Sequence, residues 1–140
     1  MSKLRVPVEE FTTPNPITAT EDSLIDDLNV LMKKNGIRHL PIIRGTRVIG
    51  IISERDMKVV TSLNTKEKMM IRASDIMRTN PVTVNAETPL DEAAFVMSKN
   101  KIGSVIVNDE NDQFLGIFTV TDALNALIEI ARDIETDNSL

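Results

Sequence analysis

The sequence contains no cysteine, no tryptophan and no tyrosine, and only one histidine among its 140 residues. Without cysteine the chain can form neither a disulfide nor a Cys-based zinc site, and it has no thiolate nucleophile. The single histidine, His39, has no second histidine or cysteine with which to build a metal site. Because aromatic residues make up only 3%, the core must consist of Ile, Leu, Val and Met.

Positive charge is also scarce. Lys and Arg number 16 against 21 Asp and Glu, which gives a formal net charge of −5. Nucleic-acid-binding proteins usually present a basic face, and anionic lipid attracts basic segments, so the charge argues against both partners. The first ten residues lack the apolar stretch of a signal peptide, and no run approaches the roughly 18 apolar residues of a membrane helix. The sequence therefore favours a soluble, cytoplasmic protein.

One seven-residue pattern occurs twice and organises the chain. Gly50–Asp56 (GIISERD) and Gly116–Asp122 (GIFTVTD) share a glycine, two apolar residues, a hydroxyl residue, two spacers and an aspartate. Upstream, Asn15–Thr18 (NPIT) matches Asn80–Thr83 (NPVT). The copies are 65 residues apart at the Asn-Pro step and 66 apart at the seven-residue pattern. The second copy therefore has one extra residue between these two motifs, in a turn. The chain is therefore one unit written twice.

Within each copy the hydrophobic pattern predicts the order β-α-β-β-α. The predicted elements are a short strand (17–20, 82–85), an amphipathic helix, a hairpin (39–43 with 47–52, 104–107 with 113–118) and a final helix (54–63, 120–135). Ser23 and Thr88 are the predicted N-caps of the first helices, Gly36 should end the first of them, and short helical lead-ins precede each copy.

We expect an α/β (α+β) fold in which each copy has a three-stranded sheet with two helices on one face. The first copy should span residues 8–63, the linker 64–72 and the second copy 73–135. Because one copy is too small to bury its core well alone, the two should pack about a pseudo-two-fold axis.

Both seven-residue patterns place a hydroxyl, open backbone N–H groups and a carboxylate together where a strand passes into a helix. That chemistry suits a hydroxylated, phosphorylated small molecule. The alternative is that Ser53 and Asp56 form only a capping box, since the chain has four Ser/Thr-x-x-Asp stretches and those starting at Ser23 and Thr88 are interpreted as plain caps. No Ser-His-Asp, Cys-His, phosphate-loop or metal set accompanies the pattern, which argues against an enzyme.

The ordered set of motifs resembles the cystathionine-β-synthase (CBS) domain, a tandem pair of which is called a Bateman module. The resemblance rests on Asn-Pro-x-Thr, the helix after it, the segment Gly36–Ile42 (GIRHLPI) and the Gly-apolar-apolar-Ser/Thr-x-x-Asp pattern, and it covers residues 8–127. It implies a regulatory module without a required cofactor, whose ligand is an adenosyl compound such as AMP, ADP, ATP or S-adenosylmethionine.

The resemblance also implies roles for individual residues. The aspartates of the repeated pattern would hold ribose hydroxyls, its Ser or Thr would contact phosphate, the Asn-Pro-x-Thr strand would edge the adenine, and Arg38 with His39 would reach phosphate. The implied ligand-binding set is Thr18, Arg38, His39, Leu40, Pro41, Ser53, Arg55, Asp56, Thr83, Ser104, Thr119 and Asp122.

The two copies differ where phosphate charge must be met. Gly103 and Ser104 stand where the first copy has Arg38 and His39, so polyphosphate nucleotides are expected to prefer the first copy. The alternatives are that His39 makes only a local hydrogen bond and that Arg38 is an ordinary surface arginine.

The last predicted helix carries an apolar stripe that is longer than one copy needs. Its residues are Ala123, Leu124, Leu127, Ile128, Ala131 and Ile134. The stripe is either intramolecular core or the seam of a homodimer, which paired modules of this family often form. A structural dimerisation module with no nucleotide ligand is the alternative to a sensor that regulates an effector protein.

Overall fold

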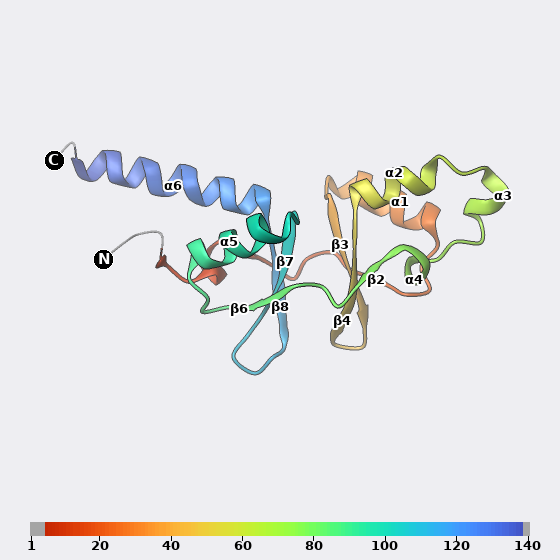
Figure 1. Ribbon diagram of the computed structural model, residues 1–140, viewed down its shortest axis with the longest axis horizontal. Helices are drawn as coiled ribbons and strands as arrows, with labels where there is room; N and C mark the ends of the chain where they lie inside the picture. The colour runs from red at the N-terminus through yellow and green to blue at the C-terminus, as the bar shows by residue number, and fades with distance from the viewer. Residues whose placement is uncertain (1–4, 139–140) are drawn as a thin grey trace. The chain divides into compact units, whose positions relative to one another are not determined.

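The computed structural model describes residues 5–138, and Figure 1 traces the chain. Residues 1–4, part of the segment expected not to be a signal peptide, lie outside the described residues. The elements are η2 (Val8–Phe11), β1 (Thr13–Pro14), β2 (Ala19–Thr20), α1 (Ile25–Asn35), β3 (His39–Arg44), β4 (Arg47–Ser53), α2 (Glu54–Thr61), α3 (Thr65–Lys68), α4 (Ala73–Ile76), β5 (Arg78–Thr79), β6 (Thr83–Asn85), α5 (Leu90–Asn100), β7 (Ser104–Asn108), β8 (Phe114–Thr119) and α6 (Val120–Asn138). The mixed α+β fold and the repeated β-α-β-β-α order are confirmed.

The first compact unit runs from Pro16 to Pro81 and holds the sheet β2-β3-β4-β5. Strand β2 is parallel to β3, and β3 forms an antiparallel hairpin with β4 through Gly45, whose φ of +62° suits glycine. Helix α1 ends at Gly36 in the left-handed conformation, as predicted. The core of this unit consists of Ile25, Leu28, Met32, Leu40, Ile42, Ile52, Met57, Val60 and Ala73.

The second compact unit combines the described residues up to Asn15 with those from Val82 onward. Its sheet has the order β1-β8-β7-β6, with β6 parallel to β7 and β7 antiparallel to β8. Lys101 takes the left-handed position at the end of α5 that Gly36 takes after α1. The core consists of Val8, Ala86, Leu90, Ala93, Met97, Val105, Val107, Phe118, Ala126 and Ile130.

The lead-in segments are exchanged between the two copies. Strand β1, which precedes the first copy, pairs with β8 of the second, and β5, which precedes the second copy, pairs with β4 of the first. The chain passes between units at the two Asn-Pro steps, where Asn15 and Asn80 both have positive φ. Each sheet therefore has four strands where three were predicted. The boundaries 8–63 and 73–135 describe the sequence repeat, and as domain limits they stay a prediction.

The exchange also decides how the first helix of each copy begins. The backbone N–H of Ile25, at the start of α1, donates to the carbonyl of Ile71, and the N–H of Leu90, at the start of α5, donates to the carbonyl of Val6. A carbonyl from the other copy's lead-in thus satisfies a helix N–H that a side chain was expected to cap. The prediction that Ser23 and Thr88 are N-caps is wrong: the N-cap residues are Leu24 and Pro89, without side-chain caps.

The glycine at the start of each seven-residue pattern is explained by the exchanged strands. Gly50 pairs with Thr79 and Gly116 pairs with Pro14. A Cβ built on Gly116 would lie 2.2 Å from the carbonyl oxygen of Thr13, whereas a Cβ on Gly50 would first meet the flexible side chain of Met77 at 2.5 Å. Glycine at position 116 therefore lets the lead-in backbone approach closely, whereas at position 50 it makes room mainly for the Met77 side chain, with the Arg78 carbonyl oxygen 3.1 Å from the same Cβ.

We predict that Gly116→Ala destabilises the protein more than Gly50→Ala does. Backbone cannot move aside as a methionine side chain can, so Gly116→Ala should cost about 1–3 kcal/mol or more of unfolding free energy. Urea denaturation of the two variants beside the wild type measures the difference. Equal losses for both would contradict the close approach of β1 to β8.

Candidate ligand-binding corners

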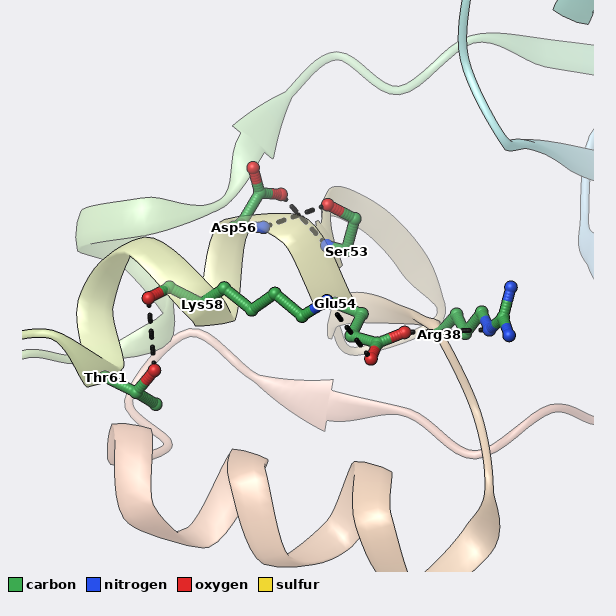
Figure 2. Close-up of polar contacts among 6 residues, drawn as sticks. All are labelled: Arg38, Ser53, Glu54, Asp56, Lys58 and Thr61. Atoms are coloured by element: carbon green, nitrogen blue, oxygen red, sulfur yellow. Dashed lines mark hydrogen bonds and ion pairs between the residues drawn. The ribbon is translucent and has the colours of Figure 1, made fainter.

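The first corner comprises Ser53 to Asp56, where β4 passes into α2. The Ser53 N–H donates to Asp56 Oδ2 at 2.9 Å, and the Asp56 N–H donates to Ser53 Oγ at 3.2 Å. Figure 2 shows this reciprocal pair at the start of the helix. The corner is therefore a capping box, which is one of the two interpretations of the sequence pattern given above. The box uses only one carboxylate oxygen of Asp56.

The second corner, Thr119 to Asp122 between β8 and α6, repeats the arrangement. The Thr119 N–H donates to Asp122 Oδ2 at 2.9 Å, and the Asp122 N–H donates to Thr119 Oγ1 at 3.2 Å. The Thr119 hydroxyl is also 3.1 Å from Oδ2 of Asp122. The two corners thus share one backbone design, and each holds its aspartate in a fixed orientation.

A lead-in strand brings one further residue to each aspartate. Arg78 on β5 lies with Nε 3.8 Å from Asp56 Oδ1, and Thr13 on β1 donates its hydroxyl to Asp122 at 3.2 Å from Oδ1 and 3.4 Å from Oδ2. Neither residue is predicted from the sequence, because the sequence pattern assigns each lead-in to the copy that follows it. Their 65-residue spacing marks them as equivalent, but spacing alone does not show which corner each one reaches.

Arg38 lies apart from the Asp56 carboxylate. Its Nε is 3.6 Å from Glu54 Oε2, and Figure 2 shows its side chain extending away from Asp56. Lys58 pairs with the other oxygen of Glu54 at 3.9 Å. These side chains line a groove of about 540 Å³ between α1 and α2, together with Asn29, Met32, Lys33, Gly36, Ile37, Met57 and Thr61. The phosphate role of Arg38 stays a prediction, and its observed partner is Glu54.

His39 begins β3 and pairs in register with Ser53, which places it beside the first corner. Burial lowers the pKa of His39 below its ordinary value, and the neighbouring Arg38 lowers this pKa further, while Asp56 and Glu54 act in the opposite direction. A neutral imidazole can both donate and accept a hydrogen bond. His39 therefore suits contact with a polar ligand better than neutralisation of a phosphate.

The remaining predicted site residues differ in exposure. Leu40, Pro41 and Ser104 are buried, so they shape the sheet behind the corners. Arg55 is exposed on α2, Thr18 is half-buried before β2, and Thr83 is exposed on β6. Their ligand-binding roles stay predictions.

In the described part of the chain, no group of three or more His, Cys, Asp or Glu residues is arranged to hold a metal ion. Within the same residues, no helix has the length and apolar character needed to cross a membrane.

The duplicated α+β unit and its two equivalent corners can be compared with known protein families. The family model described as CBS domain matches residues 8–60 and 73–129, which together make up more than half of the chain. The chain therefore belongs to the CBS domain family, as a tandem pair.

The chain is similar to several known proteins over most of its length. It is 28% identical to the CBS domain pair of protein MJ0100, solved in complex with 5-methylthioadenosine and S-adenosyl-L-methionine, with a TM-score of 0.77 over 88% of this chain and 96% of that one. It is 28% identical to AcuB from Vibrio cholerae, with a TM-score of 0.82 over 95% and 98%. Inosine-5'-monophosphate dehydrogenase of Korarchaeum cryptofilum is 30% identical over 87% of this chain, which spans only 24% of that enzyme.

We predict that His39 makes stability depend on pH between about 7.5 and 5.5, where aspartate and glutamate stay ionised. The folded-state pKa lies below the ordinary 6.5, so the unfolded chain binds the proton more readily and the unfolding free energy falls as pH drops through this range. Urea midpoints at pH 7.5 and 5.5 measure the slope. His39→Gln should flatten it, and an unchanged slope in that variant would contradict the assignment.

Proposed function

We propose that this chain is a regulatory module that binds adenosyl compounds at its two corners. The observation that carries the proposal is the duplicated aspartate whose Oδ2 closes the capping box while Oδ1 faces the lead-in strand. Because a carboxylate has two oxygens, the corner can keep its helix start intact and still accept hydrogen bonds from a ribose. Thr18, Ser53, Thr83 and Thr119 would supply neighbouring polar contacts.

The choice of adenosyl compounds as the ligand class is supported by a similar protein whose bound ligands are known. The CBS pair of protein MJ0100 holds two compounds that share an adenosine half and carry no phosphate, and it matches this chain over nearly its whole length. The part common to those ligands is the ribose and adenine, which the shared features of the two corners would bind. AMP, ADP, ATP and S-adenosylmethionine are the candidate ligands, and they act as regulators in this proposal.

The dehydrogenase relative does not make this chain a dehydrogenase, because the match covers only the region of the CBS pair in that enzyme. CBS pairs generally serve regulation, and a module of this kind acts through an effector protein or domain. If the module were purely structural, Oδ1 of each corner aspartate would serve only the contact with the lead-in strand.

Alanine substitution of the two corner aspartates tests the proposal. A hydrogen bond to a charged group contributes about 1.5–3 kcal/mol, so Asp56→Ala or Asp122→Ala should weaken binding at its own corner about tenfold to a hundredfold. Calorimetry with AMP and S-adenosylmethionine measures the affinities.

The chain supplies matched controls in Asp26→Ala and Asp91→Ala. Both residues end the other two Ser/Thr-x-x-Asp stretches and are exposed, so their loss should leave affinity unchanged. Wild-type affinity in the double variant lacking Asp56 and Asp122 would sink the proposal.

A homodimer is the second part of the proposal. In α6 the core side is formed by Ala126 and Ile130, so the exposed apolar residues Leu124, Leu127, Ile128 and Ile134 are left without a role in the described core. All four residues are about half exposed. Leu124 and Leu127 line a groove between α5 and α6 with Ala94, Met97, Ser98, Lys101, Ile102, Val120 and Ala123. A second copy covering this face would bury the stripe.

Charged residues in the stripe should abolish the dimer. We expect Leu124→Lys with Leu127→Lys to convert a dimer mass into a monomer mass by light scattering at micromolar protein, because burial of two unpaired ammonium groups is strongly unfavourable. Met70→Lys, which changes a 79% exposed methionine outside the helices, should remain dimeric. A monomeric wild type would count against the interface.

A further inference from the structure

The two corners have the same backbone design, but the first has more positively charged residues around it than the second. At four equivalent positions the first copy and the strand β5 that pairs with it carry Arg38, His39, Arg55 and Arg78. The second copy and the strand β1 that pairs with it have Gly103, Ser104, Thr121 and Thr13. Arg38 is engaged by Glu54 in the α1–α2 groove. Arg78 is the cation that the structure places on the Asp56 carboxylate.

We propose that the residue delivered by the lead-in strand sets the charge of the ligand at each corner. Arg78 selects phosphorylated adenosyl ligands at the first corner by binding phosphate while Asp56 binds the ribose. Thr13 leaves the second corner to adenosyl ligands without phosphate. This inference rests on the proposed function and adds to it the ligand class of each corner.

The electrostatic argument begins with the aspartates. A phosphate near Asp122 meets a negative carboxylate whose observed partner, the Thr13 hydroxyl, carries no charge. A phosphate near Asp56 meets the same carboxylate with a guanidinium 3.8 Å away. Both corners sit at helix starts, so the helix dipole favours an anion at each and does not distinguish them. The difference in charge therefore comes from side chains.

The geometry of Arg78 allows it to hold both groups. Its observed contact uses Nε, and a guanidinium carries five N–H donors in a fork that matches phosphate. The side chain is 63% exposed while that of Asp56 is 18% exposed, so the guanidinium reaches solvent and the carboxylate is held. Its backbone is fixed by pairing with Ile51, as that of Thr13 is by pairing with Ile117.

A pair of ligands that differ only in phosphate isolates the effect. In a full-length chain carrying Asp122→Ala, which disables the second corner, AMP and adenosine are titrated by calorimetry. Arg78→Ala should weaken AMP binding about tenfold or more and leave adenosine within about twofold, because charge-assisted bonds to phosphate are lost and ribose contacts are kept.

Arg47→Ala is the matched control, since this exposed arginine lies at the far end of β4 from the corner. It should change neither affinity.

The reciprocal variant gives a gain of binding that a misfolded protein cannot produce. In a chain carrying Asp56→Ala, Thr13→Arg should make the second corner prefer AMP over adenosine by about tenfold relative to its parent.

The outcomes separate two failures. If the wild type binds neither AMP nor adenosine, the proposed function itself is wrong. If the wild type binds them and Arg78→Ala weakens both equally, Arg78 acts only on the fold. If Arg78→Ala strengthens the binding of both AMP and adenosine, Arg78 competes with the ribose for Asp56. Either of the last two results overturns the assignment of Arg78, and failure of Thr13→Arg to favour AMP overturns that of Thr13.

Discussion

The close backbone contact between each sheet and the lead-in strand of the other copy is the constraint on which this structure depends. Without β5 and β1, the strands β4 and β8 would present unpaired edge groups. At position 116 a Cβ would collide with the backbone of Thr13, and at position 50 it would displace the Met77 side chain, so both repeated patterns begin with glycine. Because the exchange is reciprocal, neither copy completes its sheet from its own sequence.

The same short lead-in performs three tasks in each unit. It pairs with the sheet, its carbonyl at Ile71 or Val6 receives the first helix N–H, and its strand brings Arg78 or Thr13 to the corner aspartate. The first two tasks involve only backbone atoms and are met identically in both copies. The third involves a side chain, so it can differ between the copies without disturbing the fold. Under the proposed assignment, stability and ligand charge are therefore set by different atoms of one segment.

Local patterns predicted what depends on local interactions. Alternation and spacing gave the repeated element order, Gly36 as the end of α1, and both corners with their aspartates. The exchange could not be predicted, because a lead-in has the same internal pattern whichever copy it packs on. The failure at Ser23 and Thr88 has the same origin, since a distant carbonyl replaced the expected side-chain cap. Arg38 shows a further limit, as only the structure shows that Glu54 is its partner.

A capping box and a ligand site are alternative interpretations of Ser/Thr-x-x-Asp, and the geometry of the two corners is compatible with both. Capping occupies Oδ2 of each aspartate and fixes the direction of the carboxylate, which orients Oδ1 toward the lead-in strand. A carboxylate held this way loses little further freedom when it binds a ligand, so the cost of ordering it is met during folding. The two stretches that lack side-chain caps, at Ser23 and Thr88, leave their aspartates exposed and unfixed by such a box. The cap is thus what distinguishes the two corner aspartates, which we propose as the ribose-binding groups, from the other two.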